Sequence, residues 1–150
     1  MTLIKNNSVS GDAWHHHIAE QGLPTNHDIV SLAYWLENKT TLIKSGLILG
    51  LLVDGNEDFE TIEGELTHFS LIAINFPTFA DGRGYSLAKS LREKSNYAHE
   101  IRAVGDILPD QALYLTRVGF DALELPTKEH AGLALDKLSE YSVFYQPEIA

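Results

Sequence analysis

The stretch Phe76-Pro-Thr-Phe-Ala-Asp-Gly-Arg-Gly-Tyr-Ser86 connects an apolar segment to an amphipathic one. The preceding segment, Leu71–Asn75, is an apolar run of the length expected for a buried strand. After the stretch, the apolar residues of segment 87–91 share one face of a helix that should begin near Gly84. The sequence therefore predicts a strand-to-helix crossing. In parallel α/β folds, ligands bind at such crossings, at the carboxyl ends of the strands.

The alternation of strand and helix continues toward the C-terminus. We expect strands at 47–53, 71–76, 100–104 and 120–125, and helices that begin near Gly84, Pro109 and Thr127. This spacing is typical of right-handed βαβ units. The prediction is one α/β domain over residues 1–150, with a mainly parallel sheet in sequential strand order that resembles a partial (β/α) barrel. The alternative is a three-layer doubly wound sheet.

Other segments give weaker patterns. Residues 1–24 carry turn residues and little periodicity, so we expect an irregular N-terminal segment. Segment 25–28 has N-cap chemistry and predicts a helix that includes residues 29–36. Residues 56–68 read as a loop with one helical turn, and residues 142–145 as a final short strand.

Polar residues alternate with apolar ones along three of the predicted strands, at Asn75, Arg102 and Glu124. One sheet face should therefore be apolar and covered by helices, and the other partly polar. We expect Arg102 and Glu124, on consecutive strands, to pair across the polar face.

An open polar face and a free sheet edge need cover. We expect the segment around Trp14 to cover part of this surface. A second copy of the chain would cover the rest and bury Phe144 and Tyr145, which predicts a homodimer.

The composition limits the classes of partner. The formal net charge is −10, so a nucleic-acid backbone is excluded as main partner. There is no cysteine, which excludes thiol catalysis and cysteine-ligated metal sites on this chain. The sequence shows neither a signal-peptide core nor an apolar run long enough to cross a bilayer. We expect a cytoplasmic protein without membrane contact.

The candidate ligand-binding residues follow two neighbouring strands. They are Asp81, Gly82, Arg83, Gly84, Asp106, Asp110 and Gln111. A glycine loop with an arginine before a helix can hold an anion, and two carboxylates can perform acid–base chemistry or bind a hard cation. In the alternative reading, the glycines and Asp81 only shape a tight crossing, and the later acids cap a helix.

No cofactor or metal site follows from the sequence. The loop lacks the third glycine of a dinucleotide fingerprint, and no Walker pattern is present. Three adjacent histidines, His15–His17, cannot all face one metal on a regular element. His68, His99 and His130 have no metal-ligand spacing, so we predict no metal.

Several motifs together resemble a known family. They are the stretch quoted above, Leu91-Arg92, Glu100-Ile-Arg-Ala-Val-Gly-Asp-Ile-Leu, Asp110-Gln111, Gly119-Phe-Asp-Ala and Tyr141-Ser-Val-Phe-Tyr-Gln. The chain is similar over residues 29–146 to an uncharacterised bacterial family, domain of unknown function 934. It departs from the family pattern at His99, where glycine is usual, and at Pro109, where a charged residue is usual.

The resemblance implies an association with assimilatory sulfite reduction, and family members are commonly labelled probable oxidoreductases. It supplies no established catalytic residues. The residues themselves leave open whether the protein is an enzyme. The first hypothesis is an accessory or adaptor protein that binds the sulfite reductase or its electron donor. The alternative is a small-anion-binding enzyme or sensor with its site at the carboxyl edge of the sheet.

Overall fold

A curled, mostly parallel sheet organises the chain, which is represented here by a computed structural model describing residues 1–144, with side chains to residue 140. Within these residues the sheet has eight strands in the order β2-β1-β8-β7-β6-β5-β4-β3. The strands are β1 (Thr2–Lys5), β2 (Ser8–Ser10), β3 (His15–His16), β4 (Asp28–Ser31), β5 (Leu49–Asp54), β6 (Leu71–Phe76), β7 (Glu100–Gly105) and β8 (Ala122–Leu125). From β3 to β8 each neighbouring pair is parallel, whereas β1 is antiparallel to both β2 and β8.

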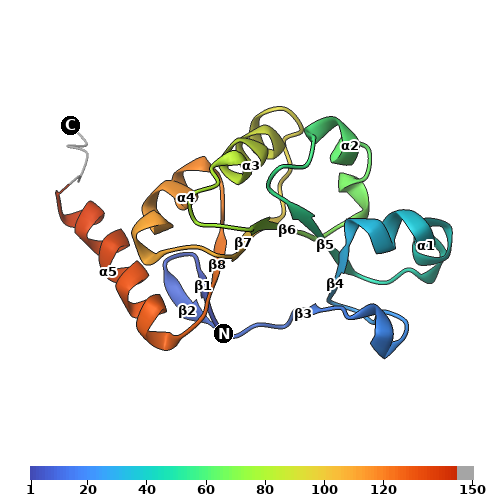
Figure 1. Cartoon of the computed structure of the whole chain (residues 1–150), viewed down its shortest axis with the longest axis horizontal. Coiled ribbons are helices and arrows are strands. Elements are labelled where there is room, and N and C mark those ends of the chain that lie inside the picture. Colours follow the sequence, from blue (N-terminus) through green and yellow to red (C-terminus); the bar gives the residue numbers. More distant parts are fainter. Residues whose placement is uncertain (145–150) are drawn as a thin grey trace.

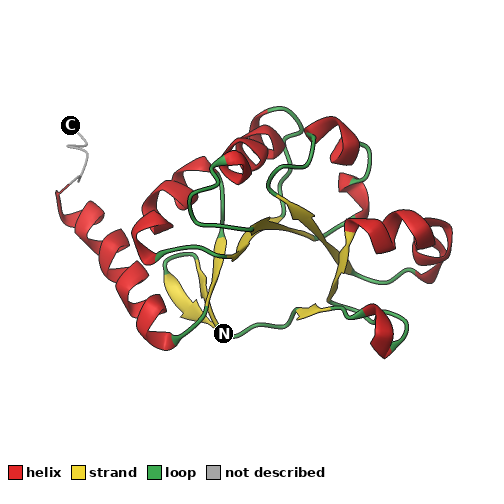
Figure 2. Ribbon diagram, in the orientation of Figure 1, coloured by secondary structure: helices red, strands yellow, loops and turns green. Residues whose placement is uncertain are grey.

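Helices lie on the convex side of this half-barrel (Figures 1 and 2). They are α1 (Leu32–Ser45), α2 (Phe59–Glu63), α3 (Arg83–Glu93), α4 (Ala112–Val118) and α5 (Lys128–Phe144), with short 3-10 turns η1 (Ala19–Gln21), η2 (Leu66–His68) and η3 (Pro109–Gln111). The main core lies between these helices and the sheet. In the central strand β6, Ile72, Ile74 and Phe76 belong to this core. No helix in the described part of the chain is long and apolar enough to span a membrane.

The predicted α/β class and sequential order are confirmed. Strands β6, β7 and β8 are neighbours in chain order, so the three-layer alternative, which needs a reversal of order, finds no support. The strand predicted at 71–76 has those bounds, and the helix predicted near Gly84 begins at Arg83.

The sequence predicted an irregular N-terminal segment, and this prediction is wrong for the first ten residues. Asn6 and Asn7 both have positive φ, 51° and 65°, and they form the turn of a β1–β2 hairpin. Two positive φ values are the requirement of a type I′ turn, which matches the twist of the flanking strands. Segment 2–5 is too short for its sequence alone to predict a strand, and in the structure it is paired with β8.

Two further elements differ from the prediction. The side chain of Asp28 accepts a hydrogen bond from the backbone N–H of Thr25 at 2.9 Å, so segment 25–28 forms a turn before β4. Helix α1 starts later and is capped by Ser31, whose Oγ accepts from Tyr34 N–H at 3.2 Å. At the C-terminus, helix α5 runs to Phe144 where a strand was predicted.

The concave face of the sheet is covered within the same chain. Residues 11–17, here called the strap, leave the hairpin and cross to β3 at the other edge of the sheet (Figure 1). Trp14 packs there against a small apolar cluster of Ile29, Leu71, Ala73 and Val104. The predicted role of the Trp14 segment is thus present, and it removes one reason for a second copy. The homodimer stays a prediction, and Tyr145 and the side chain of Phe144 lie outside the described residues.

Candidate functional site

The loops that follow β6 and β7 are tied together at the carboxyl edge of the sheet. Asp106 Oδ2 accepts a hydrogen bond from Phe79 N–H at 3.1 Å. The amide of Gln111 donates to the Phe79 carbonyl and to the Tyr85 hydroxyl, each at 2.8 Å, and accepts from Leu108 N–H at 2.7 Å. Two predicted site residues, Asp106 and Gln111, are therefore brought together, and both hold the backbone of one loop.

Asp81 and Arg83 form a separate ion pair beside that loop. Arg83 Nη2 lies 2.6 Å from Asp81 Oδ2, and Arg83 Nε donates to Asp81 Oδ1 at 3.0 Å. Hydrogen bonds from the Arg83 side chain and backbone lower the pKa of Asp81 to about 2. Asp81 therefore neutralises the arginine that was expected to attract an anion. Asp110 is not part of this group, because its exposed carboxylate lies 3.9 Å from Lys137 on α5.

The glycines of the loop allow helix α3 to approach the sheet. A Cβ on Gly84 would lie 2.6 Å from Cζ of Phe76, and a Cβ on Gly55 would lie 2.9 Å from the backbone of Gly84. Such distances leave no room for a side chain. Gly82 stands at the N-cap of α3. Packing thus accounts for Gly84, as in the alternative reading of the sequence.

An open pocket of about 250 Å³ lies next to Arg83, between the loop after β5 and the start of α3. Ser86 and Ser90 offer hydroxyl groups to it, and Glu57 and Asp58 line it as well. Two carboxylates disfavour an anion here, although the serines and Arg83 could bind one.

Two apolar side chains at the same edge were not predicted from the sequence. Phe79 is 49% exposed and Leu108 is 37% exposed. Both belong to the backbone segments that Gln111 holds. Exposed apolar residues are not unusual singly. These two lie on loops that Gln111 joins. In the sequence, the only indication of this pair was Phe79, an aromatic residue inside the glycine-containing loop 76–86.

We expect Gln111→Ala to lower the free energy of unfolding by about 1–2 kcal/mol, because it removes hydrogen bonds to three partners. Urea denaturation measures this change, and hydrogen exchange of the Phe79 amide reports the freed loop. Its neighbour Asp110→Ala is the control, with a change within about 0.5 kcal/mol, because Asp110 is exposed. Equal effects of the two substitutions would contradict the role given to Gln111.

A second polar group lies on the concave face, centred on Arg102. Its Nη1 lies 3.0 Å from Glu124 Oε2, so the two side chains expected to pair across the face do so. Arg102 also contacts Glu100 through Nε at 2.9 Å, and Lys5 and His16 complete the group at 2.7 Å from Glu100 and 2.9 Å from Glu124. Arg102 and Glu124 are buried and the side chain of Glu100 is 9% exposed, so their charges are shielded from bulk water, whereas Lys5 and His16 are partly exposed.

The strap contributes two members that the sequence reading missed, Asp12 and His16. Asp12 Oδ2 lies 2.8 Å from Arg102 Nη1. The hydrogen bond to Glu124 raises the pKa of His16 against the opposing effect of burial. Burial alone would raise the pKa of Glu124, but the bonds from His16 and Arg102 outweigh it and lower the pKa. The alternation Asp12, Trp14, His16 places all three on one side of an extended segment, a signal that the sequence did contain.

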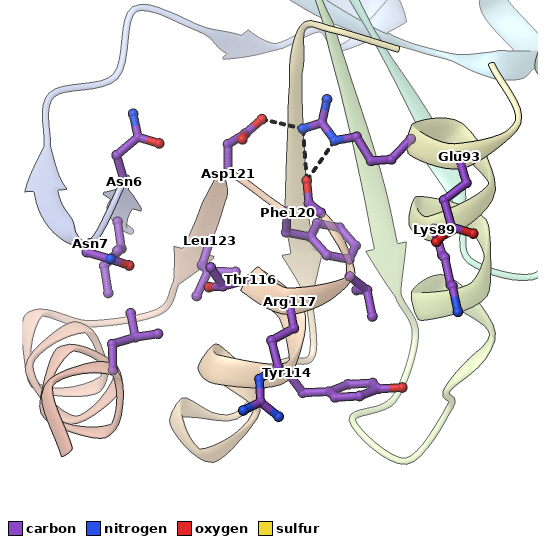
Figure 3. Close-up of a pocket in the computed structure, with 15 residues that line it drawn as sticks. Asn6, Asn7, Lys89, Glu93, Tyr114, Thr116, Arg117, Phe120, Asp121 and Leu123 are labelled. Atoms are coloured by element: carbon purple, nitrogen blue, oxygen red, sulfur yellow. Dashed lines mark hydrogen bonds and ion pairs between the residues drawn. The ribbon is translucent and has the colours of Figure 1, made fainter. Parts of the chain in front are cut away.

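A groove with a volume of about 880 Å³ lies elsewhere, around the C-terminal end of α4 (Figure 3). Lys89 and Glu93 of α3 lie on one side of it and Asn6 and Asn7 of the hairpin on the other (Figure 3). Arg92 crosses its wall and donates to the carbonyl of Gly119 at 2.8 Å and to Asp121 at 2.6 Å. This arginine joins α3 to the start of β8, which is a structural role.

The comparisons with known proteins agree with the motifs. A search of curated proteins finds no match to the chain. Residues 50–150 match the model of a family described as a bacterial protein of unknown function (DUF934). The match begins in β5 and includes the carboxyl-edge loops together with Arg102 and Glu124, whereas the strap precedes it. The match covers more than half of the sequence, and the chain therefore belongs to the DUF934 family.

Proposed function

We propose that this protein is an accessory or adaptor protein of assimilatory sulfite reduction that docks to the reductase or to its electron donor. The pathway is taken from the resemblance of the sequence to its family. The observation that carries the docking role is the exposed pair Phe79 and Leu108, whose backbones Gln111 holds. A loop whose backbone is already fixed loses little backbone entropy on binding, and buried aromatic anchors dominate many interfaces.

The charge around this pair indicates the kind of surface it would meet. Asp54, Asp58 and Asp106 are exposed near the carboxyl ends of β5 and β7, and Asp110 is exposed at η3. The whole chain has a formal net charge of −10. A partner would therefore offer an apolar pocket with a basic rim, and salt would slow their association.

The test is direct binding between the purified protein and sulfite reductase, or its electron donor, from the same organism. We expect binding at about 50 mM salt that weakens at about 500 mM. Phe79→Ser combined with Leu108→Ser should weaken it at least tenfold, because anchor residues typically contribute more than 1 kcal/mol each.

The control for that experiment is Ile43→Ser. Ile43 is 46% exposed, similar to Phe79, but it lies near the C-terminal end of α1, at the opposite end of the strands. It should leave binding unchanged. The docking proposal would be overturned if neither the reductase nor the electron donor bound at low salt. It would also be overturned if Ile43→Ser weakened binding as much as the double substitution.

The second candidate is a small-anion-binding enzyme or sensor at the carboxyl edge. The pocket next to Arg83, with Ser86 and Ser90, is the observation in its favour. The existing pair with Asp81 and the nearby carboxylates place it second. Binding of sulfite by the wild-type protein that is lost in Arg83→Gln would favour this candidate over the adaptor.

A further inference from the structure

The hydrogen bonds of Arg102 divide into an inner and an outer set. On the inner side, Nε donates to Glu100 at 2.9 Å and Nη1 to Glu124 at 3.0 Å. On the outer side, Nη1 and Nη2 donate to the two oxygens of Asp12 at 2.8 Å and 3.1 Å. This outer pair is the bidentate fork with which arginine recognises carboxylates and other oxyanions.

The three carboxylates are not held equally. Glu100 and Glu124 belong to strands β7 and β8, and their side chains are 9% and 6% exposed. Asp12 lies on the strap, between β2 and β3, and its side chain is 33% exposed. Backbone bonding of the strap to the next strand begins only at His15, whose N–H donates to the carbonyl of His27 at 2.9 Å. Asp12 also accepts a hydrogen bond from Trp14 N–H at 3.0 Å, and this bond lies within the strap. Asp12 is therefore the ligand of Arg102 that can leave without disturbing strands β7 and β8.

Removal of Asp12 would leave the group with excess positive charge. The remaining cations would be Arg102, Lys5 and protonated His16, against the carboxylates Glu100 and Glu124. With His16 protonated, one net positive charge would then be shared by Arg102, Lys5 and His16, and Arg102 would keep Glu100 and Glu124 but lose its bidentate partner. An incompletely balanced charge is costly next to a buried group, so the vacated position would favour a single negative charge.

A small open pocket borders Asp12, although Arg102 is not part of its lining. Its volume is about 270 Å³, and Asp12 and Glu124 form part of its lining. Lys128 also lines it and adds a cation. A volume of this size admits a small ion, since a water molecule occupies about 30 Å³.

We propose that Arg102 is the centre of an oxyanion site that the strap residue Asp12 occupies in the ligand-free protein. The ligand class is a small monoanion with two oxygens on one atom, because the Asp12 carboxylate already shows that such a group fits the fork. Entry of the ligand displaces Asp12 and loosens the strap. This site is on the concave face and does not depend on the adaptor role of the carboxyl edge.

The first test uses Asp12→Ala, with acetate and formate as probes at constant ionic strength. We expect about 100 mM acetate to raise the Tm of this variant by roughly 3–6 °C, as for a ligand with a Kd near 10 mM, while chloride has no such effect. The wild-type protein should respond at least tenfold more weakly, because Asp12 competes from within the chain. Asp12→Asn is the second variant, and it keeps the test open if the alanine variant does not fold without the anion.

Two double variants identify the residue that binds. Asp12→Asn with Arg83→Gln should keep the acetate response, whereas Asp12→Asn with Arg102→Gln should lose it. The proposal would be overturned if the double variant with Arg83→Gln lost the acetate response. It would also be overturned if neither Asp12→Ala nor Asp12→Asn responded to acetate.

Displacement is tested in the wild-type protein by hydrogen exchange. The amides of His15 and His17 bond to the carbonyls of His27 and Ile29. At about 500 mM acetate they should exchange severalfold faster than in equal chloride. Unchanged exchange there, while Asp12→Asn binds acetate, would show that Asp12 is a permanent structural ligand and would overturn the proposal.

Discussion

Replacement of Arg102 by methionine should lower the free energy of unfolding by about 3–5 kcal/mol near pH 7. Arg102 is 1% exposed and contacts three carboxylates, those of Asp12, Glu100 and Glu124. Methionine fills much of the same volume, so the loss reports the charges left without their cation. Urea denaturation at several pH values measures it.

The loss should become smaller as the pH falls. In the wild-type protein, burial raises the pKa of Asp12 and of Glu124, but their hydrogen bonds outweigh it and lower both pKa values. A carboxylate with a lowered folded-state pKa stabilises the fold above its unfolded pKa, and this contribution is lost as the pH falls through the folded pKa. Below about pH 4 the wild-type protein therefore loses the stabilisation from these paired carboxylates, which the Arg102→Met variant already lacks.

Arg83→Met is the control for this substitution. Arg83 also pairs with a carboxylate, but its side chain is 63% exposed, so solvent replaces the lost contact. We expect little change in stability. An Arg102→Met protein as stable as this control would mean that water enters the concave face beneath the strap.

Replacement of Gly105 by alanine should cost about 2–5 kcal/mol. Gly105 ends β7 with φ of +93°, and a Cβ there would lie 2.5 Å from the carbonyl oxygen of Phe76 and even closer to the side chain of Asn75. The left-handed conformation costs an L residue about 1–2 kcal/mol, and the overlap adds about 1–3 kcal/mol. Thermal and urea denaturation measure the sum.

The same substitution should also disturb the docking loops. The N–H of Asp106 donates to the Phe76 carbonyl at 2.8 Å, and the Asp106 carboxylate holds Phe79. We therefore expect faster hydrogen exchange at the Phe79 amide. Gly132→Ala is the matched control, because nothing lies within 4 Å of its Cβ position in α5, and it should stabilise the protein by about 0.5–1 kcal/mol. A Gly105→Ala protein that behaves like this control would contradict the close packing of β6 and β7.

The local patterns were sufficient where one element decides its own conformation. The apolar run 71–76 could only be a buried strand, and the residues after it repeat with a helical period. The alternation at Arg102 and Glu124 likewise placed both on one sheet face, because strand side chains alternate strictly. That Asp106 and Gln111 lie at one edge was predicted for a similar reason, since consecutive parallel strands end at one edge. Their role as a ligand site stays a prediction.

Strand β1 and the pair Phe79 and Leu108 were not predicted because the segments that they contact are distant in the sequence. Strand β1 is short, and it is stabilised by pairing with β8, more than 100 residues away in the sequence. Segment 142–145 was predicted as a short strand, but α5 continues to Phe144. Phe79 and Leu108 were missed because their loops are distant in the sequence and are joined through Gln111 in the structure.

The sequence by itself determined the α/β class, the strand order from β6 to β8 and the identity of the polar sheet face. These follow from periodicity and from the short connections of βαβ units, which are local. Only the tertiary structure decided that the strap crosses the concave face and that Asp12 completes the coordination of Arg102. That contact joins residues 90 positions apart. A charge buried in the sheet requires an opposite charge, but the sequence does not specify which distant segment provides it.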